Sequence, residues 1–301
     1  MSYSKYSRFG VRAWVFALVM WLVAGARGEL IRIEGPSHYA GTTQEIEGEY
    51  YRLWNALAPH RPTDTSTLAI VFYSESRRTE QAPMLPEWGG GGTIGDHTIL
   101  VSVDKQPVFA RNVHQVVVHE MVHAILNRAY PELEVPRWYH EGCAMLLSGE
   151  LSFQGKLALS RAVLTGRLLP LDAIDSVNAF SPGRAALAYN QSHACMQFLV
   201  EVYGRESIHL ILESAEQANS FYQGLRTVLG LEPGEFDVLA ENRIRRRYGF
   251  AFILGDLFLL WFVLALLVIL AYAITRIRNA RREREPAEPE QSEQPEEPDE
   301  D

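Results

Sequence analysis

Two histidines and two glutamates in the middle of the chain have the types and the spacing of a site that activates water on a metal ion. His119 and His123 lie four positions apart, so on a helix both imidazoles point from one face and can reach a single ion. Glu120 lies about 100° further round the helix axis and leans over the same spot. Glu141 follows His123 by eighteen positions and offers a third ligand of a type that zinc accepts. The pattern predicts one zinc ion per chain, with a fourth position left for water.

The chemistry of such a site is hydrolysis without a covalent enzyme intermediate. Zinc lowers the pKa of its water toward about 7 and polarises the carbonyl that the water attacks. Glu120 would be the general base, taking the proton and returning it to the leaving amine. The alternative is a pair of surface or core histidines on an ordinary helix. The helical context and the downstream Glu141 favour the metal site.

Two successive helices are predicted to position these side chains. Asn112 is the expected N-cap of the first helix, with Gln115 in the capping-box position and Pro131 just beyond its end. Pro136 can begin the second helix, which Gly149 closes. The histidine pair then lies in the middle of the first helix, and the glutamate ligand lies on the second.

A small sheet and a helical half are expected around these two helices, over about 49–135 and 136–248. Thr67–Ser74 and Thr98–Val103 are rich in β-branched and apolar residues, as buried strands are, and Glu49–Ala58 has a helical pattern. Residues 29–48 are expected to be a peripheral lead-in, and Gly89–Gly92 a loop without the Lys and Ser/Thr of a phosphate-binding loop. The further predicted helices are Lys156–Leu164, Ala185–Tyr203, Glu206–Ala215 and Phe221–Leu229.

Three segments resemble the gluzincin peptidases of the MA-like superfamily. They are HEMVH from His119, PRWYHEGCA from Pro136 and AYNQSHACMQFLVEVYG from Ala188, and the resemblance covers about 68–248. It implies an α+β, zincin-like fold with a small mixed sheet, an active-site helix and a helical subdomain. It also implies a catalytic zinc and a peptide or protein substrate. At matching positions His119, His123 and Glu141 take the family's role of zinc ligands, and Glu120 that of the base.

The sequence departs from relatives of this kind in two places. Some gluzincins carry an acidic residue four positions after the glutamate ligand, where it steadies a zinc-bound histidine, but here that position is Met145. A supporting carboxylate must then come from elsewhere, since its absence would weaken metal binding. Aminopeptidase relatives also carry a Gly-x-Met-Glu-Asn-type motif, and nothing before His119 matches it. This favours an endopeptidase or a different exopeptidase mode.

A hydrogen-bond donor should also face the metal, to hold the oxyanion that develops in the transition state. Tyr189 is the first candidate because the resemblance includes tyrosine at this place in a Y-x-Q-S helix, and His193 is the second. Either side chain could instead simply pack. His140 is expected to be a neighbour of the site and not a ligand. Four histidines show no partner pattern and receive no role: His38, His60, His97 and His209.

The N-terminus has the pattern of a secretory signal peptide. Basic residues precede an apolar run of twelve residues, Ala13–Ala24, and Ala26-Arg27-Gly28 offers small residues for cleavage. An uncleaved anchor is the weaker interpretation, because twelve residues make about 18 Å of helix against a hydrocarbon core of about 30 Å. We therefore expect residues 1–28 to be removed and residues 29–248 to be exported.

A second apolar stretch predicts a membrane anchor near the C-terminus. Leu257–Ile274 runs for eighteen residues without a charge, and 250–275 is expected to form a transmembrane helix with arginines on both sides. A buried core helix is the alternative. With the signal peptide setting the orientation, the peptidase-like part lies outside the cytoplasm, and 276–301 is expected to be a disordered cytoplasmic tail.

The charge balance and the cysteines add two smaller expectations. The formal net charge of −9 comes entirely from Glu285–Asp301, which hold nine acidic residues, so the rest has no excess of basic residues for nucleic acid. The tail is given no partner. Cys143 and Cys195 fall in the exported part and could form a disulfide between two helices, or remain two buried thiols.

Two functional hypotheses follow from these observations. The first is a membrane-tethered, exported zinc metallopeptidase. The second is a membrane-anchored binding or scaffold protein that keeps the zincin fold without turnover. Glu120 favours the enzyme, because a binding module needs no base beside its metal ligands.

Overall fold

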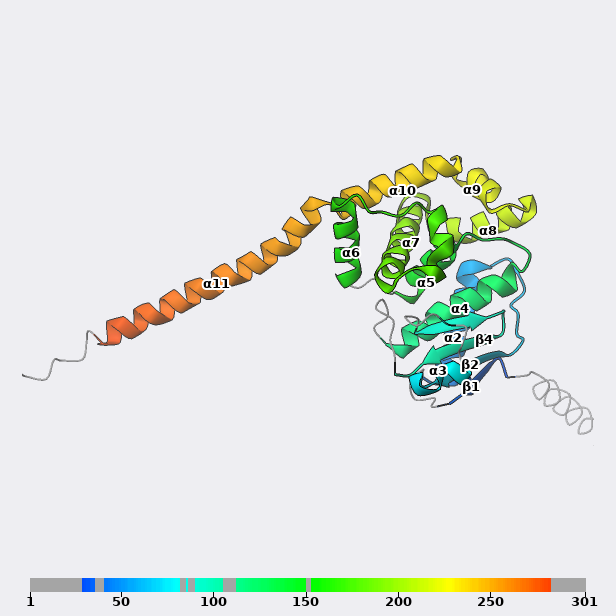
Figure 1. Ribbon diagram of the computed structural model, residues 1–301, viewed down its shortest axis with the longest axis horizontal. Helices are drawn as coiled ribbons and strands as arrows, with labels where there is room; N and C mark the ends of the chain where they lie inside the picture. Colours follow the sequence, from blue (N-terminus) through cyan, green and yellow to red (C-terminus); the bar gives the residue numbers. More distant parts are fainter. Residues whose placement is uncertain are drawn as a thin grey trace, which may run out of the picture. The chain divides into compact units, whose positions relative to one another are not determined.

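The computed structural model describes residues 29–35, 41–81, 85, 90–104, 112–149 and 153–282 (Figure 1). The described strands form one mixed sheet within the larger of its two compact units. Its strand order is β1-β2-β4-β3, with β1, β2 and β4 parallel and β3 antiparallel to β4. The strands are β1 (Ile31–Glu34), β2 (Leu68–Tyr73), β3 (Gly91–Ile94) and β4 (Thr98–Ser102). The predicted strands β2 and β4 are confirmed. Their apolar runs pair side by side, as strands covered on both faces do.

The expectation of a peripheral lead-in at 29–48 is wrong. Ile31 is fully buried in β1, which pairs with β2, and α2 (Thr43–Leu57) begins six positions before the helix predicted from Glu49. Thr42 caps α2 in a capping box: its Oγ1 accepts from Glu45 N at 3.2 Å, and its own N donates to Glu45 Oε2 at 2.8 Å. A four-residue strand is too short to show a hydrophobic period, which is why the pattern was missed.

The predicted glycine loop is also partly wrong, because Gly91 and Gly92 lie in β3. A Cβ at Gly91 would lie 2.7 Å from Val116 Cγ1 and 3.1 Å from Leu100 O. Glycine therefore lets β3 pack closely against the helix above it. Its low strand propensity hid the strand in the sequence.

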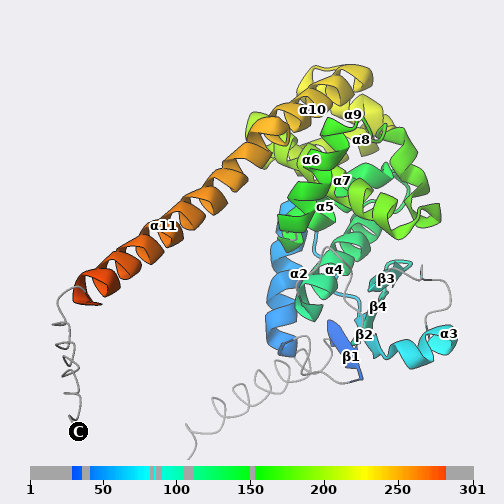
Figure 2. The same cartoon turned by 60° about the vertical axis from the view of Figure 1, so that its left-hand side comes forward.

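Two helices carry the predicted ligands, as expected. The N-cap of α4 (Val113–Ala129) is Asn112, whose side chain accepts from Gln115 N at 2.9 Å. The next helix, α5 (Arg137–Ser148), begins after Pro136 and ends at Gly149 in the left-handed conformation. In Figures 1 and 2, α2 and α4 lie over the sheet, and α4 lies between the sheet and α5.

Buried Arg128 fixes α4 to the sheet side of the fold. Its guanidinium donates to Asp96 O at 2.6 Å, Ser66 O at 3.0 Å and Thr67 O at 3.2 Å. It also lies 3.1 Å from the hydroxyl of Tyr50 on α2. These bonds satisfy the carbonyls of two loops and so hold the histidine-bearing helix in register with the strands.

The helical half follows α5. The predicted helices there are confirmed, α9 with the predicted ends and the others with shifted ends, whereas η3 and α10 were not predicted. Trp138 and Tyr139 of α5 pack on Phe221 and Phe236, which joins α5 to α9 and α10. The elements are α6 (Phe153–Leu164), η3 (Asp172–Ala179), α7 (Pro182–Tyr203), α8 (Ser207–Ala218), α9 (Phe221–Leu229) and α10 (Pro233–Arg247); two short turns, η2 (Glu75–Arg77) and α3 (Arg78–Gln81), follow β2.

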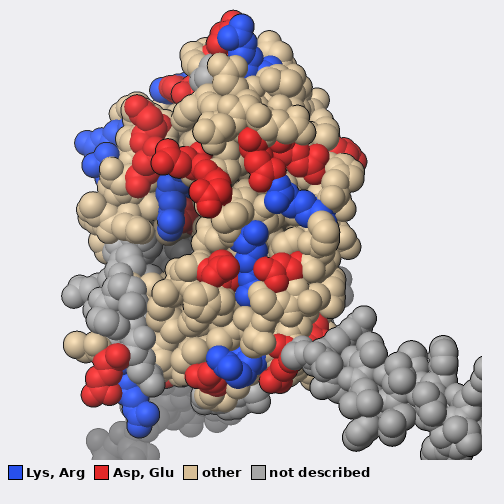
Figure 3. Space-filling view, turned by 90° about the vertical axis from the view of Figure 1, so that its right-hand side faces the viewer, with Lys and Arg blue, Asp and Glu red and all other residues tan. Residues whose placement is uncertain are grey.

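Basic and acidic side chains are mixed on one face of this part (Figure 3). On the face shown in Figure 3, the basic side chains that the structure describes are scattered among acidic ones. Several form exposed pairs, such as Arg243 with Glu201 at 2.7 Å. Such pairs contribute roughly 0–1 kcal/mol each, so packing of the buried side chains dominates the stability.

A second compact unit begins after Phe250. It contains all but the first residue of α11 (Phe250–Arg282), in which Leu260–Ala280 has a mean hydropathy of 2.3 and no buried residue. By length and composition this segment can cross a membrane. It overlaps the predicted transmembrane helix, and its exposure argues against a buried core helix. The predicted signal peptide and the tail beyond Arg282 lie outside the described residues.

Candidate metal centre

Three side chains converge where α4 meets α5. Glu141 Oε2 lies 3.2 Å from His119 Nε2 and 3.4 Å from His123 Nε2. The ligand atoms of all three residues lie within 4.8 Å of one another, and all three residues are buried. The helical spacing of the histidines and the contact between the two helices thus bring together the three predicted ligands.

The spacing of these atoms fits a tetrahedral zinc ion. With Zn–N and Zn–O bonds of about 2.0–2.2 Å, two ligand atoms of a tetrahedral site lie about 3.3 Å apart. The two distances from Glu141 Oε2 agree with that separation. Two imidazoles and a carboxylate also form the donor set of several catalytic zinc sites, which keep a fourth position open.

His140 fixes the orientation of the His123 ring. Its Nδ1 lies 3.3 Å from His123 Nδ1, and the two rings stack at 5.5 Å. Burial, followed by the positive influence of His123 and Arg137, lowers the pKa of His140 to about 3, so at pH 7 this ring is neutral. The Nδ1 of a neutral His140 can accept a hydrogen bond from His123 Nδ1–H, which leaves the lone pair of His123 Nε2 for a metal.

Arg137 contacts Glu141, the predicted glutamate ligand, from one turn earlier on α5. Its Nη2 lies 2.7 Å from Glu141 Oε1, on the oxygen that does not approach the histidines. Burial is the largest influence on Glu141 and raises its pKa. The charges of Arg137 and His123 and two histidine hydrogen bonds outweigh it and hold the pKa well below its usual value. Sequence analysis missed Arg137, although its spacing of four positions from Glu141 is that of helical ion pairs.

Thr93 on β3 holds the candidate base. Its Oγ1 lies 2.9 Å from Glu120 Oε2 and 2.8 Å from Glu120 O. The Thr93 hydroxyl orients the Glu120 carboxylate through Oε2, and Glu120 Oε1 takes no part in this contact. Thr93 was missed for the same reason as its strand, since no sequence signal marked β3.

The two candidate oxyanion donors have different surroundings. Tyr189 lies with its ring 6.1 Å from that of His119. Burial, then the charge of Glu141, raises the pKa of Tyr189 well above 10, against the lowering effect of Arg137. His193, one turn further along α7, is buried with no hydrogen bond at Nδ1 among the described residues. Burial and the charge of Arg247 lower its pKa to about 4.

Residues 59–245 match the sequence description of the Peptidase MA superfamily, which is more than half of the 301 residues. No curated protein shows detectable similarity to the chain. The chain belongs to the Peptidase MA superfamily. The superfamily match takes in α4, α5 and α7, and therefore every residue of the cluster. The relationship expected from the three motif segments is confirmed.

The two cysteines of this Peptidase MA superfamily member lie on α5 and α7, the helices that carry Glu141 and Tyr189. Cys143 on α5 and Cys195 on α7 are both buried and both free. Burial raises the pKa of each thiol far above its usual value. Both thiols are free in the structure, and a buried thiol with a raised pKa stays protonated and unreactive.

Proposed function

We propose that the chain is a membrane-tethered, zinc-dependent metallopeptidase of the gluzincin type. The convergence of His119, His123 and Glu141 in one buried cluster, with Glu120 beside it, carries this proposal. Membership of the Peptidase MA superfamily supports a peptide or protein substrate. An endopeptidase is favoured, since the sequence before His119 has no Gly-x-Met-Glu-Asn-type motif to hold a free amine.

The protein's own groups have three tasks in this reaction. When bound by His119, His123 and Glu141, zinc would supply a Lewis acid that activates water and the peptide carbonyl. Glu120, oriented by Thr93, accepts the proton of the attacking water and donates it to the leaving amine. Tyr189 keeps its phenol proton because its pKa is raised, so it can donate a hydrogen bond to the developing oxyanion.

The proposed setting is the outer face of a membrane. Residues 1–28 have the composition of a cleaved signal peptide, and Leu260–Ala280 in α11 has the length and hydropathy of a span. In this arrangement residues 29–248 act outside the cytoplasm and 276–301 lie inside. A membrane-anchored binding protein without turnover is the competing function.

Full-length chain in detergent, compared with Glu120→Gln, tests the proposal. Both proteins should keep one tightly held zinc through gel filtration, because Glu120 is not a ligand. Only the wild type should cleave a broad peptide library, with loss of activity on the order of 10²–10⁴-fold in the variant. A wild type without zinc would refute the metal site. Zinc without any cleavage would favour the binding protein.

The same assay distinguishes the two oxyanion candidates. Tyr189→Phe should lower kcat by about 10²–10³-fold with zinc retained, as expected for the loss of one donor. His193→Gln should change kcat much less, because the charge that acts on the pKa of His193 is that of Arg247, which is not part of the proposed site. The reverse order of effects would assign the role to His193.

A further inference from the structure

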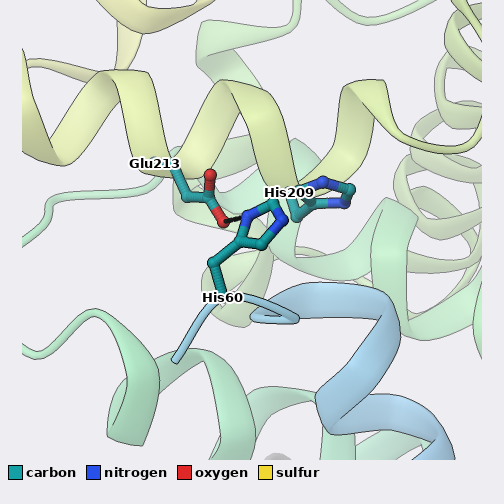
Figure 4. Close-up of side chains that lie close together, drawn as sticks. All are labelled: His60, His209 and Glu213. Atoms are coloured by element: carbon teal, nitrogen blue, oxygen red, sulfur yellow. Dashed lines mark hydrogen bonds and ion pairs between the residues drawn. The ribbon is translucent and has the colours of Figure 1, made fainter. Parts of the chain in front are cut away.

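A second group of metal-ligating side chains lies outside the site described above. His60, His209 and Glu213 each offer one ligand atom, and these atoms lie within 4.8 Å of one another. His60 Nδ1 is 2.9 Å from Glu213 Oε1, and the rings of His60 and His209 meet edge to face at 5.4 Å (Figure 4). We propose that these three residues form a second binding site for a divalent transition metal ion, with zinc as the ion to test.

The site combines one helix face with one turn. His209 and Glu213 are four positions apart on α8, so both side chains leave the same face, as the ligand histidines of α4 do. His60 comes from the turn that follows α2 and points toward α8 (Figure 4). The sequence showed no partner for His60, because Glu213 and His209 lie about 150 positions further along the chain and meet it only after folding. Without His60 beside them, His209 and Glu213 were not recognised as part of a group.

Charges around the three residues favour a cation. Arg61, next to His60, pairs with Glu216 and lies over the ring of Tyr130 at 4.5 Å. Its charge is therefore matched by a different carboxylate, and Glu213 remains available to His60. Glu206, one turn before His209, is a second acidic group that acts on this imidazole. The site thus holds two imidazoles that are neutral when metal-bound and an excess of negative charge.

Ligand chemistry selects the class of ion. Two imidazoles with one carboxylate suit zinc, copper and nickel, whereas calcium and magnesium prefer oxygen ligands only. The His60 side chain is 68% exposed and that of Glu213 22%, so ions can enter from solution and water can complete the coordination. Ligand atoms must come to about 3.3 Å from each other, and the exposed His60 ring is free to make that adjustment.

Metal binding here would join the two halves of the peptidase domain. The turn bearing His60 leads into β2 of the sheet, while α8 belongs to the helical half. An ion shared between them adds a connection independent of the packing of α4 on α5. An ion that binds only the folded chain also stabilises it by mass action.

A plain hydrogen bond between His60 and Glu213 is the competing explanation. The role of His209 distinguishes this explanation from a metal site. In that case His209 only packs edge to face against His60, so removing its imidazole would leave the bond intact. In a metal site His209 is a ligand, and His209→Ala removes ion binding.

The test counts zinc ions on the full-length chain in detergent, stripped with a chelator and then titrated with zinc in equilibrium dialysis. Wild type should take up one equivalent more than His60→Ala and His209→Ala. His97→Ala is the matched control, because His97 also pairs with a carboxylate, Asp96 at 2.6 Å, and is 67% exposed, but belongs to no three-residue group among the described residues. It should bind as many ions as the wild type.

Thermal unfolding provides a readout that does not depend on the count. The additional equivalent should raise the Tm of the wild type and of His97→Ala, and this rise should be lost in the other two variants. Equal zinc counts in wild type and His209→Ala would overturn the proposal. So would a Tm rise of the same size in all four proteins. The difference of one equivalent is informative whether or not the buried site of His119 and His123 binds zinc.

Discussion

At the scale of single residues, the site depends on how a buried carboxylate keeps its charge. Glu141 is 1% exposed, and such burial alone would favour its neutral form. Arg137 supplies a compensating charge at 2.7 Å and occupies Oε1, which leaves Oε2 to the two histidines. The neutral His140 acts on His123 in a comparable way. Two of the three proposed ligands, Glu141 and His123, are thus oriented by residues outside the H-E-x-x-H motif.

Arg137→Gln should weaken zinc binding by about 10–100-fold, the usual effect of losing a residue that orients a ligand. The physical reason is that Glu141 would lose its nearest positive charge and bind a proton more readily in competition with the metal. Zinc affinity is measured by competition with a chromophoric chelator. Arg137→Lys keeps the charge, so its zinc affinity should lie between those of the wild type and Arg137→Gln. An unchanged affinity in Arg137→Gln would contradict this role.

The sequence indicated the three residues that cluster, whose role as ligands stays a prediction, but it did not indicate Arg137 or Thr93, and the reason is physical. His119, His123 and Glu141 follow from helical periodicity and a family resemblance. Met145 suggested a site without support. The structure provides other contacts: Arg137 lies against Glu141 and Thr93 against Glu120. Arg137 belongs to the PRWYHEGCA segment, four positions before Glu141, but nothing in the family resemblance pointed to it. Thr93 lies on β3, in no motif and far from Glu120 in the chain. Contacts between segments far apart in the chain leave no spacing to detect.

At the scale of elements, the site depends on how closely α5 approaches α7. Gly142 follows the glutamate ligand, and a Cβ there would lie 2.4 Å from Met196 Cγ and 2.8 Å from Ser192 O. Backbone cannot move aside as a side-chain end can. The absence of a side chain at Gly142 therefore sets the distance between the helix of Glu141 and the helix of Tyr189.

Gly142→Ala should lower the free energy of unfolding by about 1–3 kcal/mol, as overpacking of a tight core does, and should weaken zinc binding because Glu141 shifts with α5. Gly48→Ala is the matched control. Gly48 lies within α2, exposed and with no atom within 4 Å of the added Cβ, so alanine should stabilise by about 0.5–1 kcal/mol. Urea denaturation of both variants measures the difference. Equal stabilities would show that the α5–α7 contact tolerates a methyl group.

At the scale of the whole molecule, the sequence predicted the order of the helices and strands better than the residues at which they begin and end. Long apolar or periodic segments such as α7 and α11 were found, because many residues repeat the same signal. The short strands β1 and β3 and the helix α10 were not, because few residues or a polar composition gave little period. The α+β class survived these errors, since the two central strands and the ligand helices determine it.

Reporter fusions on either side of α11 test the proposed topology. A reporter joined after Tyr248, which precedes α11, should be active only in the form that folds after export. The same reporters joined after Asp301 should be active only in the cytoplasmic form, because Leu260–Ala280 is apolar and long enough to cross the bilayer once. Arginines lie before and after this segment, so positive charge alone gives little orientation and the N-terminal signal must set it. If the reporters after Tyr248 and after Asp301 showed the opposite activities, the orientation of the chain in the membrane would be the reverse of the one proposed. Matching activities would show that α11 does not span, and the peptidase would then need another means of reaching its membrane.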